Sequence, residues 1–229
     1  MGGVNFASGQ SSAKGDIQIH NGTTYTRLGV GSNTQVLTAD STQTTGVKWS
    51  ASGGVGAWSL IDTATASSDT TIEFNNLSSS YAYYVVTITD CVPVSDGQEL
   101  LLRTSTNNGV SFDSGASDYR WSITRNQTGS GSDVGDSSDS QIDLTDSVAP
   151  IGSSTNEKAS WVIWIADPSA ASFTDIFFTG NYIRDTGSFN SHFGGGQRRE
   201  AVAVDAIQFL MSSGNIESGE FRLYGVTDA

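Results

Sequence analysis

The sequence predicts an all-β protein in which a short fibrous N-terminal segment precedes an antiparallel, jelly-roll-like β-sandwich. Three observations support this fold class. The chain contains 35 Ser, 24 Thr and 26 Gly among 229 residues, a composition poor in helix formers that argues against a helical bundle. Short β-branched and aromatic runs alternate with turn signals at the spacing typical of sandwiches and small barrels. Charge and aromatic content divide the chain into two unlike parts.

The division of charge places a domain boundary near residue 57. Residues 1–57 hold three basic and two acidic residues, whereas residues 58–229 hold 8 basic and 22 acidic ones, a net charge of −14. The glycine-rich stretch at 53–56 is the natural joint between them. We therefore predict a fibre or attachment segment at 1–57 and a β-sandwich domain at 58–229.

Seven strands are predicted in the second part, at residues 83–88, 98–104, 119–125, 160–166, 175–180, 201–211 and 220–226. The stretch 119–125 alternates apolar and polar side chains, which indicates one buried and one solvated face. The stretch 160–166 is almost entirely apolar, so we expect a central strand covered on both faces. The stretch 201–211 is long enough for a helix, but its alternating Val residues favour a strand. Between strands, Asn107-Asn108-Gly109 is a strong turn signal.

Residues 15–49 cannot enclose a core within one copy of the chain. Their apolar residues are few and lie between Gly and Thr turns: Ile17, Ile19, Leu28, Val30, Val36, Leu37 and Val47. Ordering each residue costs about 1–2 kcal/mol of conformational entropy, which so little burial does not offset. The segment therefore needs other chains around it or stays disordered. Isolated apolar residues can be buried along an axis shared between chains, and three-fold closure is a common solution.

The same segment resembles a module found in bacteriophage tail fibres. The similarity begins at Gly15-Asp16, passes through a short strand to Tyr25-Thr26-Arg27-Leu28 and a glycine-flanked turn, and ends with Gly46-Val47-Lys48-Trp49. A looser similarity to phage fibre C-terminal domains rests on Ser105-Thr106-Asn107-Asn108-Gly109 and Leu223-Tyr224-Gly225.

The resemblance implies a homotrimeric virion protein whose intertwined N-terminal segment contacts other virion proteins. Its β domain is then displayed for binding to a glycan or protein of the host-cell surface. The alternative is a structural or decoration fibre of the tail or capsid that is not receptor-specific. Host, receptor and the choice between tail and capsid stay open at this point.

Composition argues against several other function classes. A pI near 4.2 disfavours nucleic-acid binding, which needs clustered Lys and Arg. No stretch approaches the roughly 20 apolar residues of a membrane span, so no membrane insertion is expected. Cys91 is the sole cysteine, which excludes an internal disulfide. We expect no enzyme activity and no cofactor, because only His20 and His192 could serve a Ser-His-acid triad and no carboxylate pair stands out among 24 acidic residues.

An acidic segment at residues 132–146 carries five aspartates among Ser and Gly: Asp133, Asp136, Asp139, Asp143 and Asp146. Their spacing lacks the Gly and the terminal Glu of an EF-hand loop. We expect a solvated, mobile loop without a metal site, and a cation site is the alternative.

The candidate binding site is an aromatic and arginine-rich loop at residues 181–200. Such residue types are enriched in binding hot spots, and sugars are bound by aromatic faces together with polar groups. In the alternative interpretation, the Phe side chains pack beneath the loop and the Arg side chains pair with local acids or neighbouring chains. His192 is expected on the surface of this loop. Replacing Arg198 and Arg199 with Ala is expected to weaken attachment without lowering the melting temperature. The predicted binding residues are Tyr182, Arg184, Phe189, His192, Phe193, Arg198 and Arg199.

Overall fold

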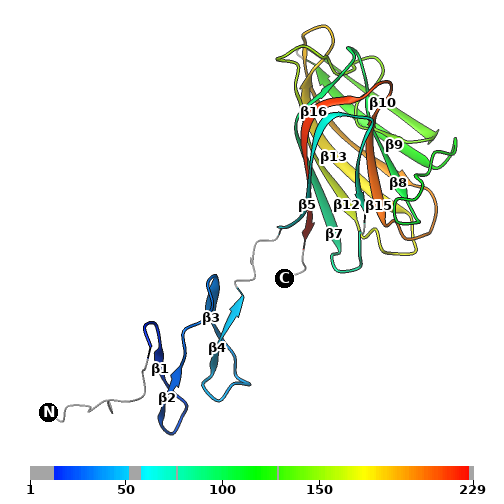
Figure 1. The fold of residues 1–229 in the computed structure, drawn as a ribbon. Coiled ribbons are helices and arrows are strands. Elements are labelled where there is room, and N and C mark those ends of the chain that lie inside the picture. Colours follow the sequence, from blue (N-terminus) through cyan, green and yellow to red (C-terminus); the bar gives the residue numbers. More distant parts are fainter. Residues whose placement is uncertain (1–12, 52–57, 76, 128, 227–229) are drawn as a thin grey trace. The chain divides into compact units, whose positions relative to one another are not determined.

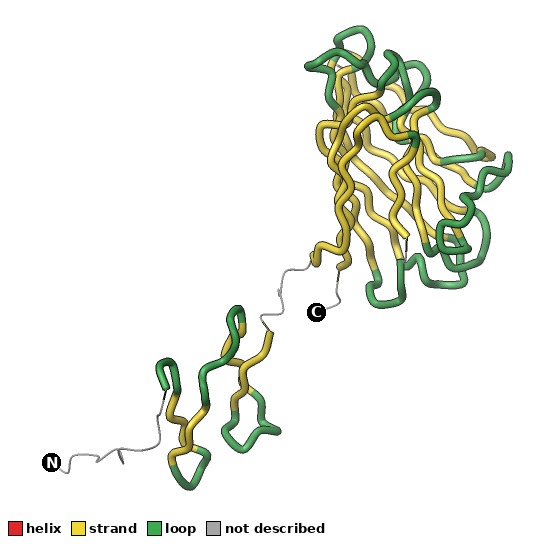
Figure 2. Tube along the Cα trace, viewed as in Figure 1, coloured by secondary structure: helices red, strands yellow, loops and turns green. Residues whose placement is uncertain are grey.

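A computed structural model describes residues 13–51, 58–75, 77–127 and 129–226, coloured along the sequence in Figure 1. Contacts divide the chain into two compact units, residues 1–56 and 57–229. The predicted glycine joint at 53–56 lies outside the described residues. The described residues form strands and turns and no helix (Figure 2), so the prediction of an all-β fold is confirmed. This part of the chain accordingly holds no helix that is long and apolar enough to cross a membrane.

The described part of the N-terminal unit consists of two antiparallel β-hairpins. The first pairs β1 (Ile17–His20) with β2 (Tyr25–Leu28), and the second pairs β3 (Gln35–Ala39) with β4 (Val47–Ala51). The turn of the first hairpin is held by Asn21, whose Oδ1 accepts hydrogen bonds from the Thr23 and Thr24 amides. The Trp49 Nε1 donates to the Gly29 carbonyl at 2.7 Å, which ties the second hairpin to the segment that follows β2.

Large apolar side chains of this unit remain on its surface. Tyr25, Val30, Val36 and Leu37 are between 43% and 57% exposed in a single copy. Among the described residues, the buried hydrophobic cluster comes entirely from residues 66–223. One copy of the N-terminal unit therefore shows the lack of a core that its sequence predicts.

The C-terminal unit contains two antiparallel sheets, as the strand pairing shows (Figure 1). The larger sheet has eight strands in the order β10-β9-β14-β13-β12-β7-β16-β5, and the smaller has four in the order β11-β8-β15-β6. Strands of the larger sheet are β5 (Trp58–Asp69), β7 (Tyr83–Pro93), β9 (Tyr119–Gln127), β10 (Ser130–Asp139), β12 (Ala159–Ala166), β13 (Thr174–Ile183), β14 (Phe189–Arg198) and β16 (Ile216–Val226). Strands of the smaller sheet are β6 (Thr71–Asn75), β8 (Leu100–Ser105), β11 (Ile142–Asp143) and β15 (Ala206–Met211).

The core of this unit joins the two sheets. Phe74 and Phe209 of the smaller sheet and Ile88, Phe178 and Phe221 of the larger sheet are at most 1% exposed and belong to one buried cluster. Burying each such side chain contributes roughly 1.5–3 kcal/mol. Along β13 every second residue is buried, so the larger sheet has an inner face on this core and an outer face away from it. Two antiparallel sheets around one core are compatible with the predicted β-sandwich.

Most of the predicted strands are confirmed. The stretches 83–88, 119–125, 160–166 and 220–226 lie inside β7, β9, β12 and β16, and 175–180 lies inside β13. The stretch 98–104 overlaps β8, which begins at residue 100. In the predicted turn, Asn108 and Gly109 have φ of 59° and 76°, the left-handed backbone that Asn and Gly tolerate best.

The stretch 201–211 forms a strand rather than a helix, but the strand begins only at Ala206. Before that point, the Val204 amide donates to the Pro168 carbonyl and the Asp205 amide donates to the Ser105 carbonyl. The Val204 amide is therefore bonded to a loop, and the contact of the chain with the end of β8 begins only at Asp205.

The predicted central strand, β12, does lie inside the larger sheet, between β13 and β7. Its inward residues are buried, whereas Val162 and Trp164 on the outer face are only partly buried. Trp164 contacts Trp58 edge to face, with ring centroids 5.2 Å apart. The expected cover on the second face is therefore incomplete in a single copy.

Two segments predicted as loops are strands, and these predictions are wrong. The acidic stretch 132–146 forms most of β10 and all of β11, and the stretch 181–200 contains the end of β13 and all of β14. Strand β10 lies at the edge of the larger sheet and is mostly exposed, so it needs few apolar residues. In the sequence, the glycines of β14 are typical of a turn. In the sheet, the atoms around Gly194 and Gly196 leave no room for a Cβ.

Candidate functional site

The predicted binding loop is a β-hairpin, so its side chains alternate between two faces of the larger sheet. Tyr182, His192 and Arg198 point inward and are at most 3% exposed. Phe189 and Phe193 point outward and are 48% and 59% exposed. The seven predicted residues therefore do not form one surface. Because successive side chains of a β-strand point to opposite faces of the sheet, residues adjacent in sequence lie on opposite sides of it.

Tyr182 and His192 form an interior polar contact. The His192 Nε2 lies 2.9 Å from the Tyr182 hydroxyl, which donates to the Ala149 carbonyl. The His192 Nδ1 lies 3.3 Å from the Leu144 carbonyl oxygen. Burial lowers the pKa of His192 and raises the pKa of Tyr182, so both side chains are uncharged at neutral pH. The prediction of a surface histidine is wrong, because this ring ties β14 to the segment after β11.

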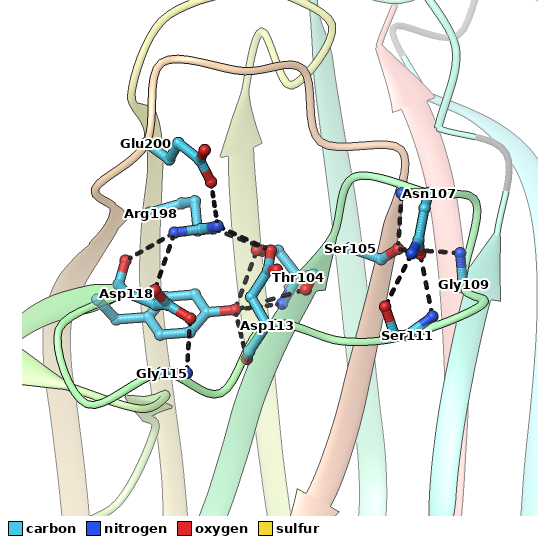
Figure 3. A network of polar contacts seen from close by, with 11 residues as sticks. Thr104, Ser105, Asn107, Gly109, Ser111, Asp113, Gly115, Asp118, Arg198 and Glu200 are labelled. Carbon is cyan, nitrogen blue, oxygen red and sulfur yellow. Dashed lines mark hydrogen bonds and ion pairs between the residues drawn. The ribbon is translucent and has the colours of Figure 1, made fainter.

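Arg198 is the buried centre of a partly exposed ionic network at the end of β14 (Figure 3). Its guanidinium donates to Asp113 at 3.0 Å and to Glu200 at 2.6 Å, and lies 3.6 Å from a carboxylate oxygen of Asp118. The same group lies over the Tyr119 ring, 5.6 Å from its centroid. Burial raises the pKa of Asp113, while the positive charge of Arg198 opposes that rise. Arg198 therefore fastens the loop at 113–118 to β14 and is not available to an external partner.

The two remaining arginines of the predicted set are also engaged by the protein. Arg184 pairs with Asp185 at 3.2 Å and donates to the Val148 carbonyl at 2.7 Å. Arg199 is exposed, and its Nη1 donates to the Ser137 carbonyl at 3.0 Å. Their role in binding stays a prediction, since these contacts leave part of each guanidinium open.

The outer face of the larger sheet is hollowed over β9, β10, β13 and β14. One open hollow has a volume of about 580 Å³, and most of its lining surface is apolar. We call it the polar hollow after the polar side chains among its lining residues, which are Arg120, Trp121, Ser122, Gly135, Asp136, Ser137, Asp175, Ile176, Gly195, Gly196 and Gln197. A second one of about 370 Å³, the aromatic hollow, is lined by Ser122, Thr124, Phe177, Phe193, Gly194 and Gly195. The two hollows share Ser122 and Gly195, so they are neighbours on one face.

A polar ladder crosses three strands at one end of this face. The Arg120 Nη2 donates to the Gln197 Oε1 at 2.6 Å, and the Gln197 Nε2 donates to the Asp175 Oδ1 at 2.5 Å. The strand register pairs Arg120 with Gln197 and Gln197 with Asp175, so these outward side chains lie side by side. Each side chain orients the next and keeps further hydrogen-bonding atoms for a ligand.

An aromatic pair lies beside the ladder: the strand register places Phe177 opposite Gly195, and Phe193 lies two residues further along β14, away from Gln197. The rings of Phe177 and Phe193 meet edge to face, with centroids 6.2 Å apart, and are 49% and 59% exposed. Of these two, the sequence-based set contained only Phe193. It also lacked Arg120, Asp175 and Gln197, because their proximity depends on the pairing of β9, β14 and β13. The polar face of residues 119–125 was the available signal, and it did not reveal the partner strands.

The glycine run in β14 has two different causes. A Cβ on Gly194 would lie 2.9 Å from the Phe178 ring, and one on Gly196 would lie 2.7 Å from Ile142, so core packing excludes side chains there. Gly195 points outward, where a Cβ would meet only the Ile176 carbonyl oxygen at an ordinary 3.4 Å. Packing within the chain therefore permits a side chain at residue 195. The glycine there leaves the sheet backbone without side-chain cover where the two hollows meet.

The five aspartates of the acidic segment differ in burial and in their hydrogen-bond partners. Asp133 and Asp136 are exposed on β10, while Asp139 accepts a hydrogen bond from the Trp121 Nε1 at 2.9 Å. Asp146 is buried and accepts two hydrogen bonds from one nitrogen of Arg125, each of 2.8 Å. Within the described ranges, no three His, Cys, Asp or Glu side chains are grouped as metal ligands.

Asp143 is the member of this segment with an unusual charge state. Asp143, on β11, is 8% exposed, and the acidic side chains of Asp139 and Glu99 act on it. Burial, followed by the negative charges of Asp139 and Glu99, raises its pKa to about 7.

Comparisons with known proteins assign neither a family nor a function to this chain. Neither protein-family models, nor curated proteins, nor solved structures give a significant match. Three features of the chain itself bear on its function: the hollowed outer face, the two-unit organisation, and the resemblance of residues 15–49 to tail-fibre modules.

Proposed function

We propose that this chain is a bacteriophage virion fibre protein that attaches to the host-cell surface through its C-terminal β domain. The observation that carries the attachment role is the hollowed outer face, where exposed Phe rings and a polar ladder flank the bare Gly195. Side chains of these kinds, gathered around a concavity, are typical of ligand sites. The resemblance of residues 15–49 to tail-fibre modules supports a place in the virion. The protein acts by binding rather than by catalysis and needs no cofactor.

The strand order supports a jelly roll with two added hairpins. Strands β5, β6, β7 and β8 alternate between the sheets, and the chain returns through β11, β12, β15 and β16. The hairpins β9–β10 and β13–β14 fall outside this sequence and extend the larger sheet beyond β12. Both hollows lie on those hairpins, and function is commonly grafted onto a scaffold in this way.

A homotrimer with an intertwined N-terminal segment is part of the proposal. The exposed Tyr25, Val30, Val36 and Leu37 of one copy become buried if three copies share an axis. Three β domains then present three sites to one surface, which converts weak single-site binding into firm attachment. The segment itself contacts other virion proteins.

The experiment is to locate the chain on phage particles and to block it. Antibody-labelled particles are imaged to separate tail tip from capsid, and host cells are preincubated with purified full-length chain before infection. We expect label on a fibre and reduced phage adsorption. Label on the particle without any effect on adsorption would instead support a structural or decoration fibre, and absence of label would refute both.

A further inference from the structure

We infer that the polar hollow and the aromatic hollow together form one binding site for a neutral oligosaccharide. This inference rests on the proposed function as a surface-binding protein and specifies its ligand class. The two hollows share Ser122 and Gly195 and lie along β14, from Phe193 at one end to Gln197 at the other. Four residues of β-strand span about 13 Å, so the site accepts an extended chain rather than a single small group.

The two ends of the site match the two faces of a sugar ring. Pyranose rings have apolar C–H faces, which pack on aromatic rings such as Phe177 and Phe193. Their hydroxyl groups both donate and accept hydrogen bonds. At the ladder, Arg120 and the Gln197 amide offer N–H donors and the Asp175 carboxylate offers acceptors, held in place by their mutual hydrogen bonds. Preorganised polar groups of this kind lose little entropy when a ligand binds.

Charge selects a neutral ligand over an anionic one. Asp136 and Asp175 both line the polar hollow, whereas Arg120 is the one cationic side chain among its described lining residues. The Arg120 guanidinium is already directed along the ladder toward the Asp175 carboxylate through Gln197. The domain around the site carries a net charge of −14. Uronic or sialic acids and phosphates are therefore repelled at short and long range, while a neutral polyol is not.

Gly195 lines both hollows, and its backbone forms the part of the site that we call the floor. Unlike Gly194 and Gly196, it faces no core residue, and the backbone would accept a Cβ at that position. A glycine in a strand interior is costly and often marks a close approach by a ligand. The missing side chain lets a sugar ring reach the sheet backbone between Phe193 and Gln197.

The test uses full-length protein on an array of defined neutral and anionic oligosaccharides, followed by titration calorimetry with the best neutral binder. We expect binding to a subset of neutral sugars. Gly195→Val, which fills the floor, is expected to reduce affinity at least tenfold, and Asp175→Asn is expected to reduce it several-fold. The matched control is Ser191→Val, which adds a branched side chain to the same strand and the same face, four residues from Gly195. It should leave affinity unchanged.

Each outcome decides the inference. Binding restricted to anionic sugars, no binding to any sugar, or equal affinity of Gly195→Val and the wild type refutes it. If Gly195→Val loses its cooperative melting transition, Asp175→Asn on the exposed surface decides instead. If purified chain blocks phage adsorption but binds no neutral sugar, the attachment function stands and the sugar assignment falls. If neutral sugars bind but the chain is absent from particles, the virion role falls and the site stands.

Discussion

At the level of single residues, Arg198 was predicted to bind a ligand but has a structural role instead. Its side chain is 4% exposed and contacts three acidic side chains, Asp113, Asp118 and Glu200. Removing Arg198 takes away its hydrogen bonds to these carboxylates, which are 24%, 30% and 57% exposed and so regain water in part. We expect Arg198→Ala to lower the free energy of unfolding by about 1.5–3 kcal/mol in urea denaturation.

The neighbouring Arg199 provides the control for this prediction. It is exposed and bonds mainly to backbone carbonyls, so Arg199→Ala should change stability by no more than about 0.5 kcal/mol. Equal effects of the two substitutions would mean that the network in Figure 3 does not stabilise the fold. The ionic contacts of Arg198 contradict the expectation that this residue can be replaced without a change in melting temperature.

Asp143 predicts a pH dependence of stability. Its pKa is raised from 3.8 to about 7, chiefly by burial and then by Asp139 and Glu99. The native state therefore holds this proton more tightly than the unfolded chain, so the stability linked to Asp143 is present below pH 4 and is lost as pH rises through 7. We expect Asp143→Asn to match the wild type at pH 4 and to exceed its free energy of unfolding by up to about 4 kcal/mol at pH 9.

The measurement is denaturant unfolding of both proteins across this pH range. Asp133→Asn serves as the control, because Asp133 is exposed on the same acidic segment and should show no such pH-dependent gain. A constant difference between Asp143→Asn and the wild type at all pH values would contradict the raised pKa.

At the scale of a strand, β14 contains adjacent glycines with opposite tolerance. A Cβ on Gly194 would lie 2.7 Å from the Ser122 carbonyl oxygen and 2.9 Å from the Phe178 ring, whereas Gly195 has room. We expect Gly194→Ala to lower stability by about 1–3 kcal/mol, because both obstacles are rigid. Gly195→Ala should be neutral or stabilise by up to about 1 kcal/mol, because Ala restricts the unfolded chain. Differential scanning calorimetry distinguishes them, and a larger loss for Gly195→Ala would contradict the assignment of faces.

At the scale of the whole molecule, the two units predict different behaviour on truncation. The buried cluster of the described chain lies within residues 66–223, and one copy of the N-terminal hairpins leaves its apolar side chains exposed. We expect light scattering of the full chain to give three times 24.0 kDa. A 58–229 fragment should keep a single cooperative melting transition, because it retains that core.

Two results would count against this arrangement. A monomer mass that is independent of concentration would refute the trimer. A fragment without cooperative melting would show that the C-terminal unit depends on the first 57 residues for its fold.

Sequence patterns predicted the all-β fold class and seven of the twelve strands described in the C-terminal unit: β7, β8, β9, β12, β13, β15 and β16. A composition rich in Ser, Thr and Gly, with period-two alternation at 119–125, is local information, and local propensity is sufficient to separate strand from helix. The core deficit of residues 15–49 is likewise visible without a structure, because it depends on counting large apolar side chains.

Which residues share a surface depends on the pairing of strands that are distant in the sequence. The stretch 181–200 has the right residue types for binding, but its strand geometry sends Tyr182, His192 and Arg198 into the core and Phe193 to the outside. The polar ladder joins β9, β13 and β14, whose residues are up to 77 positions apart in the chain. Strand register is set by long-range packing and turn geometry rather than by local sequence, so neither the ladder nor the bare floor at Gly195 could be predicted from residue order alone.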